Sequence, residues 1–258
     1  MTRPSDNAIE FVHVSYRLAD NRELLSNLDL TIQTGEILML LGRSGSGKTT
    51  TLKLINRLLV PSSGEVRVEG VPTTEWDPIK LRRRIGYAIQ DVGLFPHYTV
   101  EKNVGLIPTL ENWSRDKVSA RVREVLTLVG MSPDQFLQRY PDQLSGGQRQ
   151  RIGLARALAA DPPILLMDEP FGALDPLSRV DLQKEFKQLQ QRLGKTVVFV
   201  THDVGEALLL GDRIALMEEG RLLSLQSPRE FATSQDPRTK SYLEAFRAGH
   251  HLLEGEAR

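Results

Sequence analysis

The sequence predicts an α/β fold in which buried parallel strands are accompanied by a small antiparallel sheet and a helical insertion. Three observations support this prediction. Continuous apolar runs, which suit buried parallel strands, occur at residues 37–41, 164–167 and 196–201. Alternating segments near the N-terminus favour an antiparallel sheet, and helical spacing dominates residues 92–160. A chain of 258 residues can bury a sizeable core, as one large domain or two modest ones.

Composition limits the classes of function before any motif is considered. Lys and Arg total 33 and Asp and Glu total 33, so the formal net charge is zero and gives no support for broad electrostatic binding to nucleic acid. The absence of cysteine excludes disulfides and thiolate metal sites. The first residues lack the apolar stretch of a signal peptide, and no apolar run approaches the ~18 residues of a membrane span. We therefore expect a cytoplasmic protein that reaches a membrane only through a partner.

Three N-terminal segments are expected to form the small antiparallel sheet, namely residues 9–16, 28–32 and 66–68. Tyr16 ends the first of them. Its aromatic face can stack on a nucleobase, although a single tyrosine in a strand more often serves packing.

The segment after the apolar run 37–41 carries the most specific motif of the chain. It reads Gly42-Arg43-Ser44-Gly45-Ser46-Gly47-Lys48-Thr49, which fits G-x-x-x-x-G-K-[ST], and residues 50–59 continue as a helix. The glycines allow the backbone to approach an anion, and the helix N-terminus adds N–H donors. The alternative, a glycine turn with a chance lysine, does not explain the order of strand, loop and helix. The sequence therefore predicts a phosphate-binding loop, with Lys48 on the β/γ-phosphates and Thr49 on magnesium.

A second strand, residues 85–89, stops at Gln90. A polar residue that ends a buried parallel strand lies at the carboxyl edge of the sheet, where ligands bind in open α/β folds. On its own, Gln90 is more simply read as an ordinary surface residue. The apolar loop at residues 91–97 is a candidate protein-contact surface.

A second candidate phosphate-binding helix start lies at Ser145-Gly146-Gly147-Gln148. Ser145 and Gln148 satisfy the capping-box pattern, so the simplest reading is a well-made helix start. Two glycines in a first turn are costly for a helix, however, and suit a backbone that an anion must approach. One nucleotide does not obviously need both helix starts from the same subunit.

The strand at residues 164–167 runs into Asp168 and Glu169. An acidic residue at this edge can hold magnesium, and its neighbour can polarise an attacking water. The strand at residues 196–201 ends at His202, which can donate to a γ-phosphate, although a single histidine there is often structural. Residues 214–217 and 222–225 are expected to form a hairpin, and a terminal helix is expected from Ser227.

Together, these motifs resemble those of the ATP-binding subunits of ABC transporters over almost the whole chain. Residues 42–49 are similar to the Walker A loop of that family, Gln90 to its Q-loop and residues 144–148 to its signature. Residues 164–169 are similar to the Walker B strand, residues 173–175 to the D-loop, His202 to the switch histidine and Tyr16 to the adenine-stacking aromatic. Asp91 and Gly205 depart from what the family leads us to expect, with no evident consequence.

The resemblance implies a single P-loop NTPase ABC cassette, residues 1–258, with a RecA-like core, a small antiparallel β subdomain and an α-helical signature subdomain. It places the core and the antiparallel subdomain in residues 1–91 and 161–226, the helical subdomain in residues 92–160 and a C-terminal helical tail in residues 227–258.

The resemblance also implies an ATPase that uses ATP and Mg²⁺ in a head-to-tail homodimer, where the signature of one copy closes over ATP on the other. Glu169 is then the general base, His202 holds the γ-phosphate, Gln90 senses the metal and water, and Lys48 carries phosphate charge. The implied magnesium residues are Thr49, Gln90 and Asp168. The implied nucleotide-binding residues are Tyr16, Gly42, Arg43, Ser44, Gly45, Ser46, Gly47, Lys48, Thr49, Thr50, Ser145, Gly146, Gly147, Gln148 and Asp175.

Several segments are more closely similar to importer subunits for osmoprotectants and other quaternary amines, such as glycine betaine, choline or proline betaine. They are residues 53–58, 83–90, 93–97 and 168–176. This similarity implies transmembrane permease subunits, docked through residues 94–96 on the inner face of the membrane, and indirectly a substrate-binding protein. An ATPase for another cargo, such as an amino acid or an export substrate, is the first alternative. A soluble cassette protein acting on ribosomes or DNA is the second, and it is disfavoured because such proteins usually fuse two cassettes or carry long basic or coiled-coil insertions.

Overall fold

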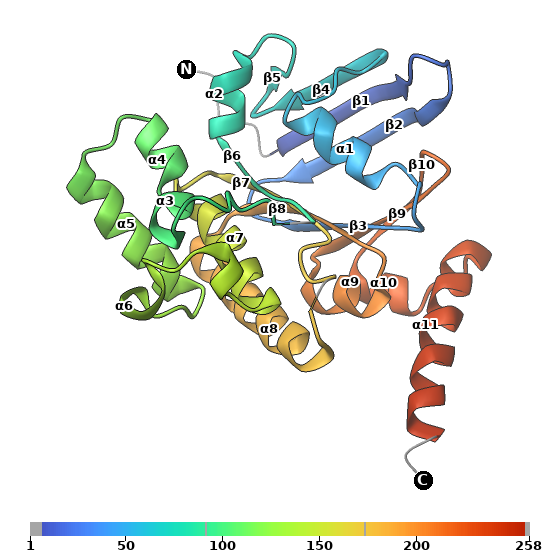
Figure 1. Ribbon diagram of the computed structural model, residues 1–258. Coiled ribbons are helices and arrows are strands. Elements are labelled where there is room, and N and C mark those ends of the chain that lie inside the picture. Colours follow the sequence, from blue (N-terminus) through green and yellow to red (C-terminus); the bar gives the residue numbers. More distant parts are fainter. Residues whose placement is uncertain (1–6, 91, 173, 256–258) are drawn as a thin grey trace. The chain divides into compact units, whose positions relative to one another are not determined.

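The computed structural model describes residues 7–90, 92–172 and 174–255 and divides the chain into two units. The first unit comprises residues 1–75 and 198–258, and the second comprises residues 76–197. Asp91 and Ala173, which belong to the expected Q-loop and D-loop segments, lie outside the described residues. The following paragraphs describe each unit by itself (Figure 1).

The antiparallel sheet of the first unit has the strand order β2-β1-β4-β5. Its strands are β1 (Asn7–Arg17), β2 (Glu23–Gln33), β4 (Ser63–Val68) and β5 (Val71–Pro72). Phe11 of β1 is paired with Leu30 of β2 and with Val66 of β4, and all three side chains are buried. The predicted small sheet is therefore confirmed. The sequence pattern missed β5 because two residues show no period.

The first unit also contains the strand that leads into the phosphate loop. This strand, β3 (Ile37–Leu41), is buried throughout and pairs in parallel with β9 (Arg213–Glu218), which forms the predicted hairpin with β10 (Arg221–Gln226). Next to β3 lies β8 (Thr196–Thr201), whose residues 198–201 belong to this unit.

The helices of the first unit are α1 (Lys48–Ile55), α9 (Val204–Leu210), α10 (Pro228–Ala232) and α11 (Pro237–Gly255). The predicted helix 50–59 is shorter than expected because the chain turns at Arg57, which has a φ of 53°. The single expected terminal helix is in fact two, α10 and α11. The first begins at the predicted capping box of Ser227 and Glu230, and Pro237 starts the second.

In the second unit, two short strands run in parallel and end together. They are β6 (Ile85–Ala88) and β7 (Ile164–Asp168), with Ile85 opposite Ile164 and Ala88 opposite Met167. Since parallel neighbours end at the same edge, the residues that follow them become neighbours.

The rest of the second unit is mainly helical, as the sequence predicts. Its helices are α2 (Pro78–Arg83), α3 (Val100–Val104), α4 (Leu106–Leu110), α5 (Arg115–Leu128), α6 (Pro133–Phe136), α7 (Gly146–Leu158) and α8 (Pro176–Leu193), with a 3₁₀ turn at Pro141–Gln143. Helix α5 begins at Arg115, because the Ser114 hydroxyl caps it by accepting from the backbone N–H of Lys117.

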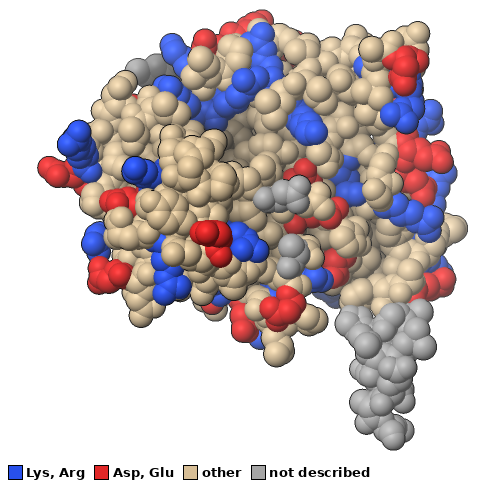
Figure 2. Space-filling view, in the orientation of Figure 1, with Lys and Arg blue, Asp and Glu red and all other residues tan. Residues whose placement is uncertain are grey.

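Two properties concern the surface of the chain. Within the described residues, every helix is too short or too polar to cross a bilayer. Basic and acidic side chains are interspersed over the face shown in Figure 2, in keeping with the zero net charge.

Candidate nucleotide-binding site

The phosphate loop follows β3 and has a backbone that only glycine adopts easily. Gly45 and Gly47 have φ values of 80° and 100°. A Cβ atom on Gly47 would lie 2.6 Å from Cδ2 of Leu25 and 3.0 Å from the carbonyl oxygen of Leu24. A Cβ atom on Gly42 would lie only 2.2 Å from the carbonyl oxygen of Met217. The loop is therefore held tightly against the rest of its unit at both ends.

The ammonium group of Lys48 lies inside this loop. Its side chain is nearly buried, and Nζ donates to the carbonyl oxygens of Gly42 at 2.7 Å and of Arg43 at 2.9 Å. The loop backbone thus wraps around a positive charge, which stabilises the loop and favours an anion beside it.

Two further features of the loop fit a phosphate group. Gly47 is the N-cap of α1 and provides no side-chain cap for the N–H groups of the first turn. The hydroxyl oxygen of Ser46 is buried and has no hydrogen-bond partner among the described residues. A buried polar atom without a partner is unusual in a native structure, and it indicates that a ligand completes this site.

The other two candidates of the first unit lie at strand ends. Tyr16 lies near the end of β1, half-buried and paired with Leu25 of β2. His202 follows β8 and is exposed, directly before the α9 cap residue Asp203. Asp203 accepts a hydrogen bond from the backbone N–H of Gly205 at 2.7 Å, which fixes the turn after the histidine.

In the second unit, the ends of β6 and β7 bring together three predicted residues. Nε2 of Gln90 donates to Oε2 of Glu169 at 3.4 Å. Asp168, the last residue of β7, is buried, whereas Glu169 is half-buried and has a φ of 46°. A carboxylate that faces an amide at a strand edge can accept a proton from a water molecule held between them.

Tyr87 is a residue of this site that the sequence analysis missed. Its hydroxyl donates to the Asp168 carboxylate, and the pKa of Tyr87 is raised, first by burial and then by the negative charge of Asp168. Tyr87 is opposite Leu166 in the β6–β7 register, two residues from Asp168 and therefore on the same face. Alternation of side chains along β6 places Tyr87 on one face of the sheet. This pattern identifies Tyr87 as a neighbour of Asp168 only when the partner strand and the register are known.

The signature segment forms the predicted capping box at the start of α7. The Ser145 hydroxyl accepts from the backbone N–H of Gln148 at 3.2 Å, and Oε1 of Gln148 accepts from the backbone N–H of Ser145 at 3.0 Å. The structural reading of these two residues is therefore confirmed. Gly147 is different, because an added Cβ would meet only Cδ2 of Leu174, at an ordinary 3.6 Å. Packing within the described residues thus does not require a glycine at position 147.

Asp175 is the N-cap of α8. Its side chain accepts from the backbone N–H of Ser178 at 3.0 Å, and its hydrogen bonds with Ser178 lower the pKa of this carboxyl group. This local role accounts for an acidic residue here, and a role toward nucleotide remains a prediction.

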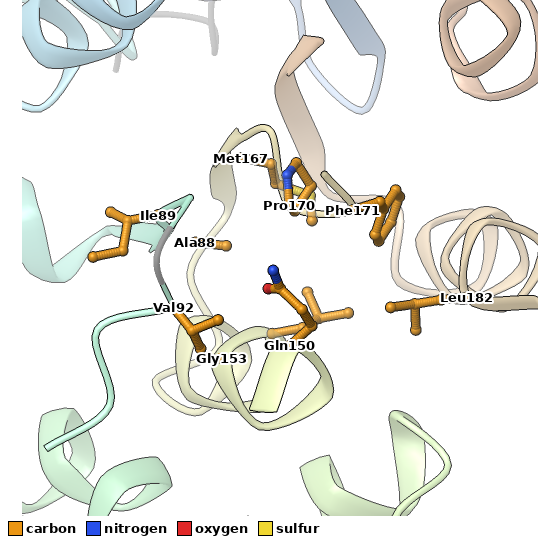
Figure 3. A pocket seen from close by; sticks show the side chains of 10 residues that line it. Ala88, Ile89, Val92, Gln150, Gly153, Met167, Pro170, Phe171 and Leu182 are labelled. Carbon is orange, nitrogen blue, oxygen red and sulfur yellow. The ribbon is translucent and has the colours of Figure 1, made fainter. Parts of the chain in front are cut away.

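The segment after Gln90 is anchored on α7. Val92 has a φ of 52°, a strained value for a β-branched residue. Its side chain packs closely on Gly153, because a Cβ atom on Gly153 would lie only 2.6 Å from Cγ1 of Val92. The guanidinium group of Arg156 donates to the carbonyl oxygens of Val92 and Gly93. In Figure 3 the side chain of Gln150, also on α7, points between Ala88 and Pro170 in a small pocket behind the strand ends.

The predicted site residues thus fall into two groups. The first unit carries Tyr16, the phosphate loop 42–49 with Thr50, and His202, and the second carries Gln90, residues 145–148, Asp168, Glu169 and Asp175. Among the residues that the structure describes, no cluster of three or more His, Cys, Asp or Glu side chains forms a metal site. A magnesium ion on Thr49 or Asp168 would therefore need further ligands, such as water and phosphate.

Comparisons with known proteins find a matching family, similar proteins and similar solved structures. The profile of the ABC transporter family matches residues 25–172. The glycine betaine/carnitine/choline transport ATP-binding protein of Bacillus subtilis (strain 168) is 47% identical over 246 residues, covering 95% of this chain and 64% of that protein. The glycine betaine uptake system ATP-binding protein of Escherichia coli (strain K12) is 48% identical over 225 residues, covering 87% of this chain and 72% of that protein. The chain thus spans less than two thirds of the length of the Bacillus subtilis relative and 72% of the Escherichia coli one.

A solved structure is also similar. It is the dimeric, post-hydrolysis state of an ATP-binding cassette bound to ADP and Pi, with a TM-score of 0.77 and 35% sequence identity, covering 86% of this chain and 99% of that one. The similarity confirms the predicted cassette fold.

Proposed function

Because the chain belongs to the ABC transporter family, we propose that it is the ATP-hydrolysing subunit of an importer for a quaternary amine such as glycine betaine. The relatives named for glycine betaine, carnitine and choline support this cargo. The cargo rests on similarity alone, since no residue of the described site is expected to contact it.

The observation that carries the ATPase proposal is the phosphate loop around Lys48, with its buried Ser46 hydroxyl and an α1 start that lacks a side-chain cap. In this proposal Lys48 compensates the charge of the β- and γ-phosphates, and the N–H groups of the loop bind phosphate oxygens. Thr49, Asp168 and Gln90 would hold Mg²⁺, which would neutralise part of the phosphate charge. Tyr16 stacks on the adenine base.

Glu169 is the proposed general base. Its carboxylate already accepts a hydrogen bond from Gln90, so the amide can orient both the carboxylate and the water molecule to be deprotonated. His202 is proposed to hold the γ-phosphate from the turn that Asp203 fixes.

We also propose that the active form is a head-to-tail homodimer, in which residues 145–148 and Asp175 of each copy complete the nucleotide site of the other. Two observations support this. Packing does not require a glycine at position 147, where an added Cβ would make only an ordinary contact with Leu174, and the similar solved cassette is dimeric.

Permease subunits are the proposed membrane partners, with docking at a groove in the second unit. A cavity of about 260 Å³ there is lined by both apolar and basic side chains, among them Tyr87, Phe95, Leu106 and Arg156. Phe95 belongs to the loop that the sequence analysis selected and is 41% exposed. The groove lies beside the segment that Arg156 ties to α7, so a docked helix would contact the part of the chain that follows Gln90. A substrate-binding protein would be reached only through the permease.

Uptake of labelled glycine betaine at high osmolarity tests this function in cells that lack other betaine importers and contain the cognate permease and binding protein. We expect uptake with the wild-type chain, loss of uptake with Lys48→Ala, and normal uptake with the control Lys184→Ala, which removes an exposed lysine from α8. Equal uptake with and without a functional Lys48 would exclude betaine as the cargo. The same strains given labelled amino acids test the alternative cargo, and ATP hydrolysis by the purified chain tests the ATPase separately.

A further inference from the structure

The C-terminal helix α11 packs with one side against the rest of the first unit. Thr239 is fully buried and Leu243 is 4% exposed, four residues apart, and Tyr242 and Phe246 are four residues apart on an adjacent row. These four side chains therefore make the contacts between α11 and the rest of the first unit. In Figure 1 this helix follows α10 at the end of the chain.

Phe246 lies over the turn that follows His202. A Cβ atom on Gly205 would be 3.1 Å from Cε2 and 3.5 Å from Cζ of the Phe246 ring. A larger residue at position 205 would push this ring away. Gly205, which departs from the family expectation, is thereby explained: it makes room for α11 on the first turn of α9.

Tyr242 lies one turn earlier in α11, and its hydroxyl points toward the phosphate loop. This oxygen is buried and makes no hydrogen bond of standard geometry within the described part of the chain. The backbone N–H of Arg43 is nevertheless close enough to act on it. Burial raises the pKa of the Tyr242 phenol, and the Arg43 N–H partly opposes that shift.

The peptide bond between Gly42 and Arg43 connects this observation to Lys48. The carbonyl oxygen of Gly42 accepts from Nζ of Lys48 at 2.7 Å. In a planar trans peptide the N–H of the next residue points in the opposite direction from that carbonyl. Lys48 and Tyr242 therefore approach opposite edges of the same peptide group.

We propose that Tyr242 is a positioning residue for ATP binding, whose hydroxyl accepts the Arg43 N–H when the loop binds phosphate and so fixes the Gly42–Arg43 peptide. The orientation of that peptide sets where the Gly42 carbonyl holds the Lys48 ammonium. A purely structural anchor would need only the aromatic ring, whereas burying a hydroxyl without a partner costs free energy. This inference rests on the proposed ATP binding.

The test is the variant Tyr242→Phe, which keeps the ring and removes the oxygen, compared with wild type and with Tyr140→Phe, which removes the same atom from an exposed tyrosine of the second unit. Direct titration with ATP and Mg²⁺ by calorimetry gives Kd, steady-state hydrolysis gives KM and kcat, and hydrogen exchange of residues 42–47 reports on the loop with and without ATP.

We expect Tyr242→Phe to weaken ATP binding by about 3- to 10-fold, the range for one hydrogen bond. KM should rise by a similar factor, whereas kcat should stay nearly unchanged. Hydrogen exchange in the loop of the ATP complex should be faster than in wild type. Tyr140→Phe should match wild type in all three measurements. Equal ATP affinity and equal loop exchange in Tyr242→Phe and wild type would overturn the inference. So would a loss of melting temperature with kcat and KM changing together. If wild type itself binds no ATP, the proposed function fails first, and the titration shows this before any variant is compared.

Discussion

The side-chain amide of Gln90 donates to the carboxylate of Glu169 across the ends of two parallel strands, with 3.4 Å between Nε2 and Oε2. The two residues are 79 positions apart in sequence, and the parallel pairing of β6 and β7 brings them together. A permease helix that displaced the segment after Gln90 would therefore disturb the proposed general base directly.

Replacing Glu169 by glutamine should abolish most ATP turnover and keep ATP binding. The amide has nearly the shape of the carboxylate but cannot accept the proton of the attacking water, so we expect kcat to fall by about 10²- to 10⁴-fold. Phosphate release and ATP titration measure the two properties separately. Hydrolysis near the wild-type rate would remove Glu169 from the role of base.

Replacing Tyr87 by phenylalanine should change how stability depends on pH. The pKa of Tyr87 is raised in the folded chain above the value of about 10 expected when unfolded, so above pH 10 the folded state keeps a proton that the unfolded state loses. The free energy of unfolding contributed by this group is complete below about pH 10 and is lost as the pH rises toward the folded pKa. Urea unfolding between pH 8.5 and pH 11 should show a shallower alkaline decline for Tyr87→Phe. Parallel declines in the two proteins would contradict the contact with Asp168.

Replacing Gly147 by alanine should leave folding intact and prevent formation of the ATP-dependent dimer. An alanine Cβ makes an ordinary contact with Leu174, and alanine is the better helix former by up to about 1 kcal/mol, so the melting temperature should stay equal or rise. The same methyl group would stand between the Gly147 backbone and phosphate bound to a second copy. Light scattering with ATP, in a Glu169→Gln background, should show the dimer for the parent and a monomer for the variant. A stable ATP-dependent dimer of the Gly147→Ala variant would exclude close approach at this position.

Replacing Gly86 by alanine should destabilise the second unit without touching any proposed nucleotide contact. The added Cβ would lie 2.3 Å from the carbonyl oxygen of Ala157, a backbone atom of α7 that cannot move alone. We expect a loss of about 1–3 kcal/mol, the range for overpacking, in chemical denaturation. A midpoint equal to that of wild type would show that β6 and α7 separate easily.

Local sequence patterns predicted those parts of the fold whose boundaries are local. The strand β8 was predicted at Thr196–Thr201, as found, because a continuous apolar run lies between a glycine turn and polar residues. The hairpin β9–β10 was likewise marked by Glu219 and Gly220, both of which have positive φ. The division of the C-terminal tail was missed, because capping signals at Ser227 do not show where the helix stops.

The sequence predicted those site residues that lie next to each other in one short segment of the chain. Residues 42–49 and 168–169 stand next to each other in the chain, so their pattern is visible in one segment. Tyr87 and Tyr242 were missed for the opposite reason. The first depends on the register of β6 against β7, and the second depends on α11 packing beside the phosphate loop, and neither relationship leaves a local period.

Arg156 links two segments of the second unit that are far apart in sequence. Its guanidinium group binds the carbonyls of Val92 and Gly93 while its own backbone is part of α7. Val92 also packs closely on Gly153 of α7. Two contacts therefore join α7 to the segment that follows Gln90. A displacement of the loop at residues 92–95 would therefore reach α7 and Ser145 at its start, as well as Gln90.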